Sequence, residues 1–259
     1  GTVVTLFCVH GVSGTDVWAV GASGVILHRT GMGWSAVTSG VGTVLNAVWA
    51  VDGSCAYAVG AGGVILKWDG TSWSSLTSGT AETLRGVWAA DALNVWACGD
   101  NGTVLMSTDG GATWAAEASS TSLGLRAIRG TSPWDVWAVG AGGTAVRRTP
   151  AGPWVPVFTG IGSVLFGLAP DGTLQEGVAF PISQNVWACG SSGRLLLSEP
   201  GDTFGIAYCP VVTTINSLWA LSPSYVWAVG AGGVILRLFD GGFSRVRVYF
   251  PEVEGEDIY

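Results

Sequence analysis

Short apolar runs separated by glycine-containing turns follow one another along the whole chain. A run such as DVWAV at 16–20 is followed by a glycine turn and then by VILHR at 25–29. The runs are rich in Val, Ile, Leu and Trp, which is the composition of β-strands. Glycine interrupts the chain about every ten residues, and few segments have the 3.6-residue period of a helix. The pattern predicts an all-β protein.

One apolar motif recurs six times. It reads VWAVGAGG at Val136–Gly143 and again at Val226–Gly233, with near copies at Val17–Gly24 and Ala56–Gly63. Its aromatic residue falls at positions 18, 57, 96, 137, 187 and 227, and glycines follow three and six residues later in every copy. A period of about 40 residues is typical of propellers and of repeat arrays.

Each repeat divides into four strand-like runs, which predicts a six-bladed β-propeller of four-stranded antiparallel blades. The expected units are 3–40, 41–79, 80–120, 121–160, 161–211 and 212–251, so residues 1–251 form one propeller. Residues 252–259 are expected to be an acidic C-terminal tail. No strand is expected to be shared between the first and last blades, because each unit runs through its own four strands. An alternative is that the six units belong to a seven- or eight-bladed propeller.

The fifth unit is longer than the others. Ala169–Ser183 adds about ten residues between its first and second strands, and an insertion of this kind belongs in a surface loop. We expect this loop at one rim of the disc.

The glycine-rich motif resembles a phosphate-binding loop only superficially. A dinucleotide-binding loop needs G-x-G-x-x-G between a strand and a helix. In this chain Gly140, Gly142 and Gly143 are followed by Thr144 and a further strand, and no Gly-Lys-Ser or Gly-Lys-Thr occurs. The motif therefore predicts a hairpin whose glycines take positive φ, and no cofactor is expected.

Residues 107–114 read STDGGATW, which matches the Asp-box pattern S-x-D-x-G-x-T-W. The chain resembles Asp-box propellers of the sialidase type. Its repeats also resemble the photosystem II assembly-factor propellers and related secreted bacterial repeat proteins. The resemblance implies that Asp109 and Trp114 belong to a structural, non-catalytic turn between the third and fourth strands of a blade.

The composition argues against several partners. The net charge is −7, only 11% of residues are charged, and the tail holds four of the eighteen acids. A nearly neutral body is not suited to duplex DNA or anionic membranes, and no apolar run reaches the length of a membrane-spanning helix. We expect no nucleic-acid partner and no membrane span.

The five cysteines show no zinc-binding or thioredoxin-like spacing. Cys98 and Cys189 stand where other copies of the motif have valine, so they are expected to fill the core. Cys8 and Cys209 could form a disulfide that joins the first unit to the junction of the fifth and sixth. No metal site is expected.

The residues do not favour an enzyme. A glycosidase needs two carboxylates facing one cleft, whereas most acids of the body stand in turns, among them Asp52, Asp69 and Asp171. The two histidines, His10 and His28, lie in separate strands, which gives a Ser-His-Asp site little support. We therefore expect no catalytic activity, with a sialidase-type glycosidase as the least favoured alternative.

One slot of the first strand varies between the copies. It holds Phe7, Asn46, Arg85, Arg126, Phe166 and Asn216. In a propeller the first strands line the central channel, so Arg85 and Arg126 are expected near its mouth with Arg129 further along. Converging cations in a hollow favour an anionic ligand. The candidate ligand-binding residues are Arg85, Arg126, Arg129, Asn46 and Asn216; alternatively, each arginine binds a backbone carbonyl or an aspartate and stabilises the channel.

Together these features predict a non-catalytic binding or scaffold propeller that takes a protein segment or a glycan at the channel mouth. Low charge and a single lysine suit a secreted, periplasmic or cell-surface bacterial protein. An alternative is a structural subunit that self-assembles in a surface layer or filament.

Overall fold

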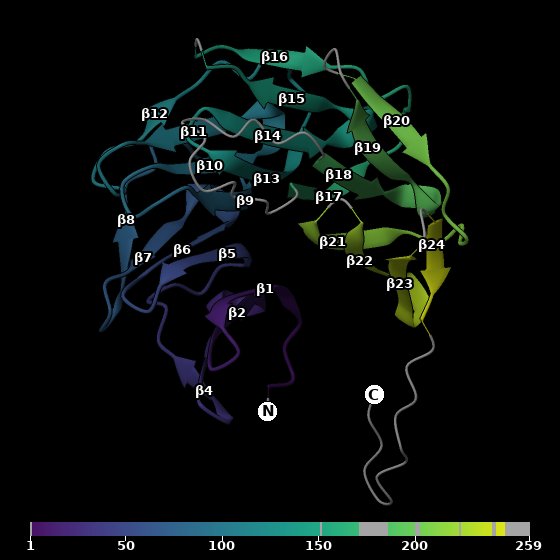
Figure 1. Ribbon diagram of the computed structural model, residues 1–259. Helices are drawn as coiled ribbons and strands as arrows, with labels where there is room; N and C mark the ends of the chain where they lie inside the picture. The colour runs from purple at the N-terminus through teal and green to yellow at the C-terminus, as the bar shows by residue number, and fades with distance from the viewer. Residues whose placement is uncertain are drawn as a thin grey trace, which may run out of the picture.

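The computed structural model describes residues 2–150, 152–170, 186–199, 203–222, 224–239 and 242–246. Within them the chain forms six antiparallel four-stranded sheets arranged around a central axis (Figure 1). This arrangement confirms the predicted six-bladed β-propeller. Most of the predicted insertion and the whole acidic tail lie outside the described residues.

Each blade consists of four consecutive strands, with the first nearest the axis and the fourth at the outer edge (Figure 1). The first strands are β1 (Leu6–Ser13), β5 (Leu45–Asp52), β9 (Leu84–Ala89), β13 (Leu125–Ser132), β17 (Leu165–Pro170) and β21 (Ile215–Ser222). The second strands are β2 (Asp16–Gly21), β6 (Cys55–Gly60), β10 (Val95–Gly99), β14 (Asp135–Gly140), β18 (Val186–Gly190) and β22 (Tyr225–Gly230).

The outer half of each blade follows the same order. The third strands are β3 (Ile26–Thr30), β7 (Ile65–Trp68), β11 (Val104–Ser107), β15 (Ala145–Arg148), β19 (Leu195–Glu199) and β23 (Val234–Phe239). The fourth strands are β4 (Gly33–Val37), β8 (Trp73–Leu76), β12 (Ala115–Ala116), β16 (Trp154–Val157), β20 (Thr203–Ala207) and β24 (Gly242–Arg245).

The repeated glycine motif forms the turn between the second and third strands. In every blade this turn is a single 3₁₀ segment: η1 (Ala22–Gly24), η2 (Ala61–Gly63), η3 (Asp100–Gly102), η4 (Ala141–Gly143), η5 (Ser191–Gly193) and η6 (Ala231–Gly233). Gly63 has a φ of +73°, and a Cβ there would lie 2.0 Å from the carbonyl oxygen of Thr80. Glycine is therefore required by both conformation and space.

The core lies between blades, not within them. Buried residues of blade 1 pack against buried residues of blade 2: Trp18, Val20 and Ile26 meet Leu45, Val48, Leu66 and Trp73. Trp18 and Trp73 meet edge to face with ring centroids 5.1 Å apart. The alternating pleat of each sheet thus supplies one apolar face to each neighbouring blade.

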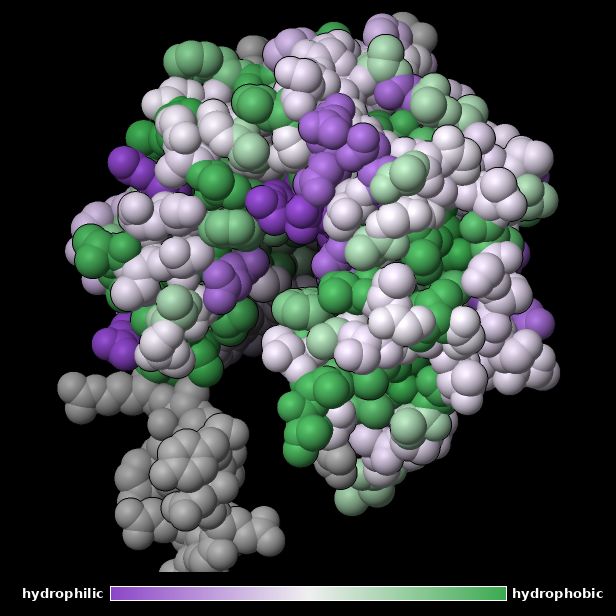
Figure 2. All heavy atoms as spheres, turned by 180° about the vertical axis from the view of Figure 1, so that it is seen from behind, coloured by the Kyte–Doolittle hydropathy of each residue, from purple (hydrophilic) through white to green (hydrophobic). Residues whose placement is uncertain are grey.

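The ring is open. Neighbouring blades pack against each other from blade 1 to blade 6, whereas blades 6 and 1 face each other across a wedge that Figures 1 and 2 both show. Val9 on β1 is 62% exposed, although Val48, in the same slot of blade 2, is 0% exposed. The two terminal blades therefore lack the cover that each of the others receives.

All five cysteines are free thiols. Cys98 and Cys189 are fully buried in the core, and burial raises the pKa of the Cys98 thiol to about 12. The possible disulfide between Cys8 and Cys209 is wrong. Cys8 packs into the interface of blades 1 and 2, whereas Cys209 packs against the interface of blades 5 and 6.

Candidate functional site

A cavity of about 560 Å³ occupies the centre of the ring. First strands of all six blades contribute to its wall, and the lining residues are Val9, His10, Trp49, Trp88, Arg129, Gly130, Thr131, Leu168, Ala169, Pro170, Ser217, Leu218, Trp219 and Ala220. Aromatic and apolar side chains dominate, with a few polar groups among them. This is the composition of a ligand-binding cavity.

One slot of the repeat lines this cavity. Counted from the leading apolar residue of each first strand, the fifth position is His10, Trp49, Trp88, Arg129, Ala169 and Trp219. The copies differ at this position, as they also do at the slot of Arg85 and Arg126. Sequence reasoning missed His10 and the three tryptophans. The signal that could have identified them is this variation at an axis-facing position.

Arg129 brings a positive charge into the cavity. Its Nη1 donates to the carbonyl oxygens of Val87 at 3.0 Å and Ile128 at 2.9 Å, and its guanidinium lies 4.7 Å from the ring centroid of Trp49. Burial lowers the pKa of Arg129 from its ordinary value. No described carboxylate forms an ion pair with it, so the charge is held by carbonyls and aromatic faces alone.

His10 is a neutral member of the cavity wall. Its ring stacks on Trp49 with centroids 3.8 Å apart, and its Nδ1 accepts a hydrogen bond from the backbone N–H of Ala50 at 3.1 Å. Burial, together with the charge of Arg129, lowers the pKa of His10 to about 4. At neutral pH it therefore acts as an acceptor and an aromatic surface.

The predicted slot of Arg85 and Arg126 lies at the other end of the first strands, where each strand starts. The strand register shifts there in every blade, as between Leu45 and Ala47, which leaves one residue unpaired. Bulges of this kind re-aim side chains. The unpaired residues are Phe7, Asn46, Arg85, Arg126, Phe166 and Asn216.

Arg85 forms an ion pair with Asp100. Arg85 donates from Nε and Nη2 to the two oxygens of Asp100 at 2.5 and 2.7 Å, and this pair lowers the pKa of Asp100. The positive charge of Arg126 contributes to the same shift. The Nε of Arg126 is buried and has no hydrogen-bond partner among the described residues. Arg85 is thus bonded to Asp100, whereas Arg126 influences that carboxylate only through its charge.

The remaining candidates are dispersed. Asn46 donates from Nδ2 to the carbonyl oxygen of Leu84 at 2.8 Å, so it ties blade 2 to blade 3. Asn216 is exposed and is not among the residues that line the cavity, although its neighbour Ser217 is. Figure 2 shows hydrophilic residues gathered beside the central hollow on the face seen from behind. The five candidates therefore do not form a single site.

Asp109 lies in the turn between β11 and β12. Its Oδ1 accepts hydrogen bonds from Ser107 Oγ at 2.8 Å and from the Thr113 N–H at 2.9 Å, and its Oδ2 accepts from Thr113 Oγ1 at 2.6 Å. These bonds hold the pKa of Asp109 at about 2. Trp114, at the end of the turn, packs against the core shared by blades 2 and 3.

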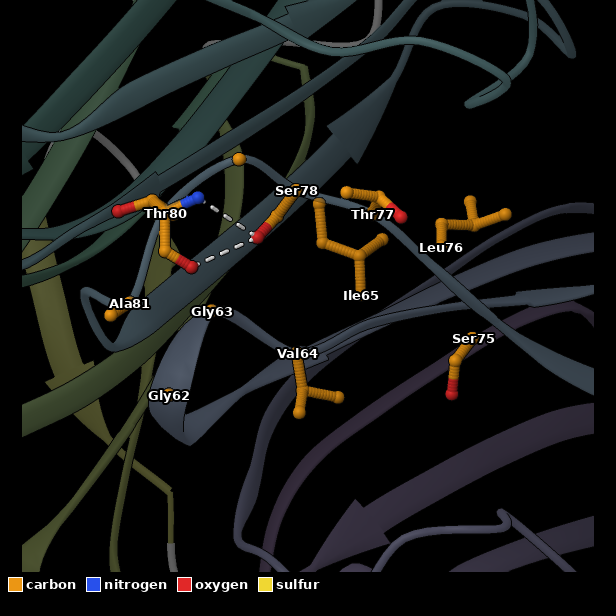
Figure 3. A pocket seen from close by; sticks show the side chains of 11 residues that line it. Gly62, Gly63, Val64, Ile65, Ser75, Leu76, Thr77, Ser78, Thr80 and Ala81 are labelled. Carbon is orange, nitrogen blue, oxygen red and sulfur yellow. Dashed lines mark hydrogen bonds between the residues drawn. The ribbon is translucent and has the colours of Figure 1, made fainter.

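A second hollow, of about 460 Å³, lies beside η2 (Figure 3). Its wall consists of Gly62–Ile65 and Ser75–Ala81, which include no charged residue. Ser78 Oγ donates to the Thr80 carbonyl oxygen at 3.2 Å and accepts from the Thr80 N–H at 3.3 Å. Ser39 makes the same bonds with Val41, so this feature belongs to the repeated turn and not to a ligand site.

Outside the cavity, we looked for groups that could act in catalysis or bind a metal ion. His28 forms a hydrogen bond with Asp16 at 2.8 Å and stacks on Trp18, so its ring is held by a carboxylate and an aromatic face. Among the described residues no group of three or more His, Cys, Asp or Glu could hold a metal ion. The described helices include none that is long and apolar enough to cross a membrane.

Comparisons with known proteins bear on the fold. No family model and no curated protein matches the sequence. A structure of YCF48 bound to D1 peptide superposes with a TM-score of 0.71 at 21% identity, covering 94% of this chain and 81% of that one. YCF48 from Cyanidioschyzon merolae gives 0.70 at 18% identity, with coverages of 94% and 85%. The shared fold is a β-propeller.

The likeness extends to a solved structure of lower sequence identity. The structure of U3-55K superposes with a TM-score of 0.74 at 11% identity, covering 95% of this chain and 82% of that one. At such identities the likeness shows the fold alone. The predicted resemblance to photosystem II assembly-factor propellers is therefore supported for the fold, and the comparisons say nothing of the Asp-box turn.

Proposed function

We propose that this propeller is a non-catalytic binding scaffold that takes a segment of another protein in its central cavity. The observation that carries the proposal is the position of Arg129. This cation has no carboxylate partner among the described residues and lies among aromatic rings in a hollow to which all six blades contribute. An extended segment with an acidic side chain or a free carboxylate would supply the missing anion. Its apolar side chains would pack against the tryptophans.

The cavity wall argues against hydrolysis. Among the described residues that line it there is no Asp or Glu, whereas a glycosidase needs two carboxylates in one cleft. The one histidine of the wall already accepts a backbone hydrogen bond at Nδ1. Binding is the activity that this arrangement of groups favours.

The comparison structures offer limited support. YCF48 has been solved with a D1 peptide bound, so a propeller of this shape can hold a peptide. With 21% identity between the chains, the likeness carries over neither the peptide nor its contacts. The proposal therefore depends on the cavity of this chain.

Titration of the protein with matched peptides tests the proposal. Short extended peptides that carry one Asp next to an apolar residue should quench tryptophan fluorescence, and their Asp→Asn counterparts should bind at least about tenfold more weakly, since a hydrogen bond to a charged group contributes roughly 1.5–3 kcal/mol. Equal affinity for both peptide sets, or no binding by either, would refute an anion-seeking cavity.

A glycan is the second candidate ligand. Trp219 is 54% exposed at the cavity wall, and an exposed aromatic face beside polar groups can stack on a sugar ring. The same fluorescence titration with neutral and acidic oligosaccharides separates the two candidates. Saturable binding of a neutral oligosaccharide without binding of any peptide would favour the glycan.

We further propose that the protein acts outside the cytoplasm. Its low content of charged residues and its single lysine support this location. Protease treatment of intact host cells tests it, because an exposed or secreted protein is digested or found in the medium. Protection equal to that of a cytoplasmic marker would overturn the proposal.

A further inference from the structure

Every interface between neighbouring blades is built from two complementary apolar faces. The blade that comes first along the chain provides a leading face from its second and third strands, such as Trp18, Val20 and Ile26. The next blade provides a receiving face from its first, third and fourth strands, such as Leu45, Val48, Leu66 and Trp73. The repeat reproduces both faces in every copy.

Blade 1 has a receiving face on which no other described blade packs. The residues in these slots are Leu6, Val9, Leu27 and Trp34, and all but Leu27 are among the exposed large hydrophobic residues. They line an open hollow of about 550 Å³. Terminal repeats that need no partner normally carry a polar outer face, which blade 1 does not have.

Blade 6 has an uncovered leading face. Val229 is 44% exposed, although its counterparts Val20, Val59 and Val139 are each 0% exposed. Trp227 is half-buried, whereas its counterparts Trp18 and Trp96 are fully buried. The wedge of the open ring is thus bordered by the two halves of one repeated interface, one on each side (Figure 2).

A second copy of these six blades cannot fill the wedge. A blade that enters it must present a receiving face to blade 6 and a leading face to blade 1. Blade 1 has only its receiving face free and blade 6 only its leading face, because their other faces are buried against blades 2 and 5. Contact between copies would satisfy one side of the wedge and form an open chain of molecules.

We propose that the wedge is the seat of a seventh four-stranded blade of the same repeat, carried by the same polypeptide outside residues 1–259. The thirteen residues 247–259 are fewer than the roughly 40 that a blade requires. The superposed propellers also contain chain without a counterpart here, since this chain covers 81% and 82% of two of them. Exposed apolar faces of this kind mark interaction surfaces.

The seventh blade would also complete the central cavity. Val9 of blade 1 and Trp219 of blade 6 both line this cavity and both border the wedge. Between them the wall is open. The first strand of an inserted blade would close the wall and shield these side chains from water, but the inference does not depend on what the cavity binds.

Adding a blade tests the proposal. A copy of residues 41–79 is placed after residue 251, followed by the native 252–259, so that the two proteins differ only in the blade. We expect the seven-bladed protein to melt several degrees higher and to lose most of its binding of the apolar dye bis-ANS. A matched protein whose added blade carries Val48→Ser and Val59→Ser should show neither gain.

Point variants of the existing chain give an independent measurement. Val9→Ser should change Tm little in the six-bladed protein, whereas Val48→Ser, in the same slot of blade 2, should lower it by several degrees. In the seven-bladed protein Val9→Ser should lower Tm as Val48→Ser does. Equal losses in the six-bladed protein would mean that blades 6 and 1 close on each other, which overturns the proposal.

Two further results would contradict it. If light scattering finds a dimer that no longer binds bis-ANS, a second copy covers the faces. If the protein isolated from its own cells has the mass of residues 1–259 alone, the blade is not part of the polypeptide. A native mass larger by at least one blade, with dye binding absent from the native protein, is the expected result.

Discussion

The guanidinium of Arg129 lies over the ring of Trp49, 4.7 Å from its centroid, while its Nη1 donates to the Val87 carbonyl oxygen at 3.0 Å. These three residues come from blades 4, 2 and 3. One arginine therefore spans three neighbouring blades at the cavity wall. Its charge and its packing have separate consequences, which substitutions can distinguish.

Arg129→Met keeps much of the side-chain volume and removes the charge. We expect the affinity for an acidic peptide to fall by about tenfold or more, because a charge-assisted hydrogen bond contributes roughly 1.5–3 kcal/mol. Affinity for the matched neutral peptide should change much less. Calorimetric titration of both peptides measures the difference, and equal losses would show that Arg129 only maintains the shape of the cavity.

Most of the fold could be predicted from the sequence, because each blade is a local unit. The recurring aromatic and the two glycines after it identify the second strand and its turn in all six copies. The open ring could not be predicted in this way. Val9 and Val229 occupy slots that are apolar in every copy, and only the arrangement of the blades leaves those two uncovered.

The candidate site was only partly predictable. Variation within a repeat slot pointed to Arg85 and Arg126, and the structure places both at strand bulges near Asp100. Nothing in the sequence links Asp100 to that slot, because the contact arises from folding of the η3 turn. In sequence, Trp49 and Trp88 resemble the tryptophans of the second strands. Only the arrangement of the strands shows that Trp49 and Trp88 face the cavity.

His10 should make stability depend on pH. Its pKa is about 4 in the folded protein and about 6.5 ordinarily, so between these values the unfolded chain binds a proton that the folded chain does not. Stability therefore falls as the pH is lowered from about 6.5 to 4, by on the order of 3 kcal/mol at about 1.4 kcal/mol per pKa unit.

Urea unfolding at several pH values measures this loss, and His10→Gln, which keeps a hydrogen-bond acceptor, should flatten the profile in that window. Carboxylates contribute mainly below it. If the wild-type protein instead becomes more stable as the pH is lowered from about 6.5 to 4, the prediction is wrong, because the folded protein would then bind more protons than the unfolded chain.

Glu117 joins blade 3 to blade 4. Its Oε1 accepts from Arg148 Nε at 3.2 Å and its Oε2 from Trp154 Nε1 at 2.8 Å. Arg148 is only 7% exposed, so Glu117→Ala leaves a buried cation without its carboxylate. We expect a loss of about 3 kcal/mol in the free energy of unfolding.

Glu117→Gln should cost less than Glu117→Ala, since the amide oxygen can still accept one of the two hydrogen bonds. Equilibrium unfolding in urea ranks the three proteins. If Glu117→Ala is as stable as the wild type, the backbone bond from Arg148 to Pro133 is sufficient to hold the guanidinium.

The turn around Asp109 should be sensitive to acid. Hydrogen bonds from Ser107 and Thr113 hold its pKa at about 2, below the ordinary 3.8. The stabilisation is present above the ordinary value and is lost as the pH falls through about 2. Asp109→Ala should lower Tm at neutral pH and reduce the slope of Tm against pH below about 4. Thermal melts of both proteins from about pH 5 to pH 2 measure this change. Asp69→Ala, which removes the corresponding bonds of the blade 2 turn, provides the matched comparison. If the slopes of Tm against pH are parallel for the wild type and Asp109→Ala, Asp109 does not contribute to acid unfolding.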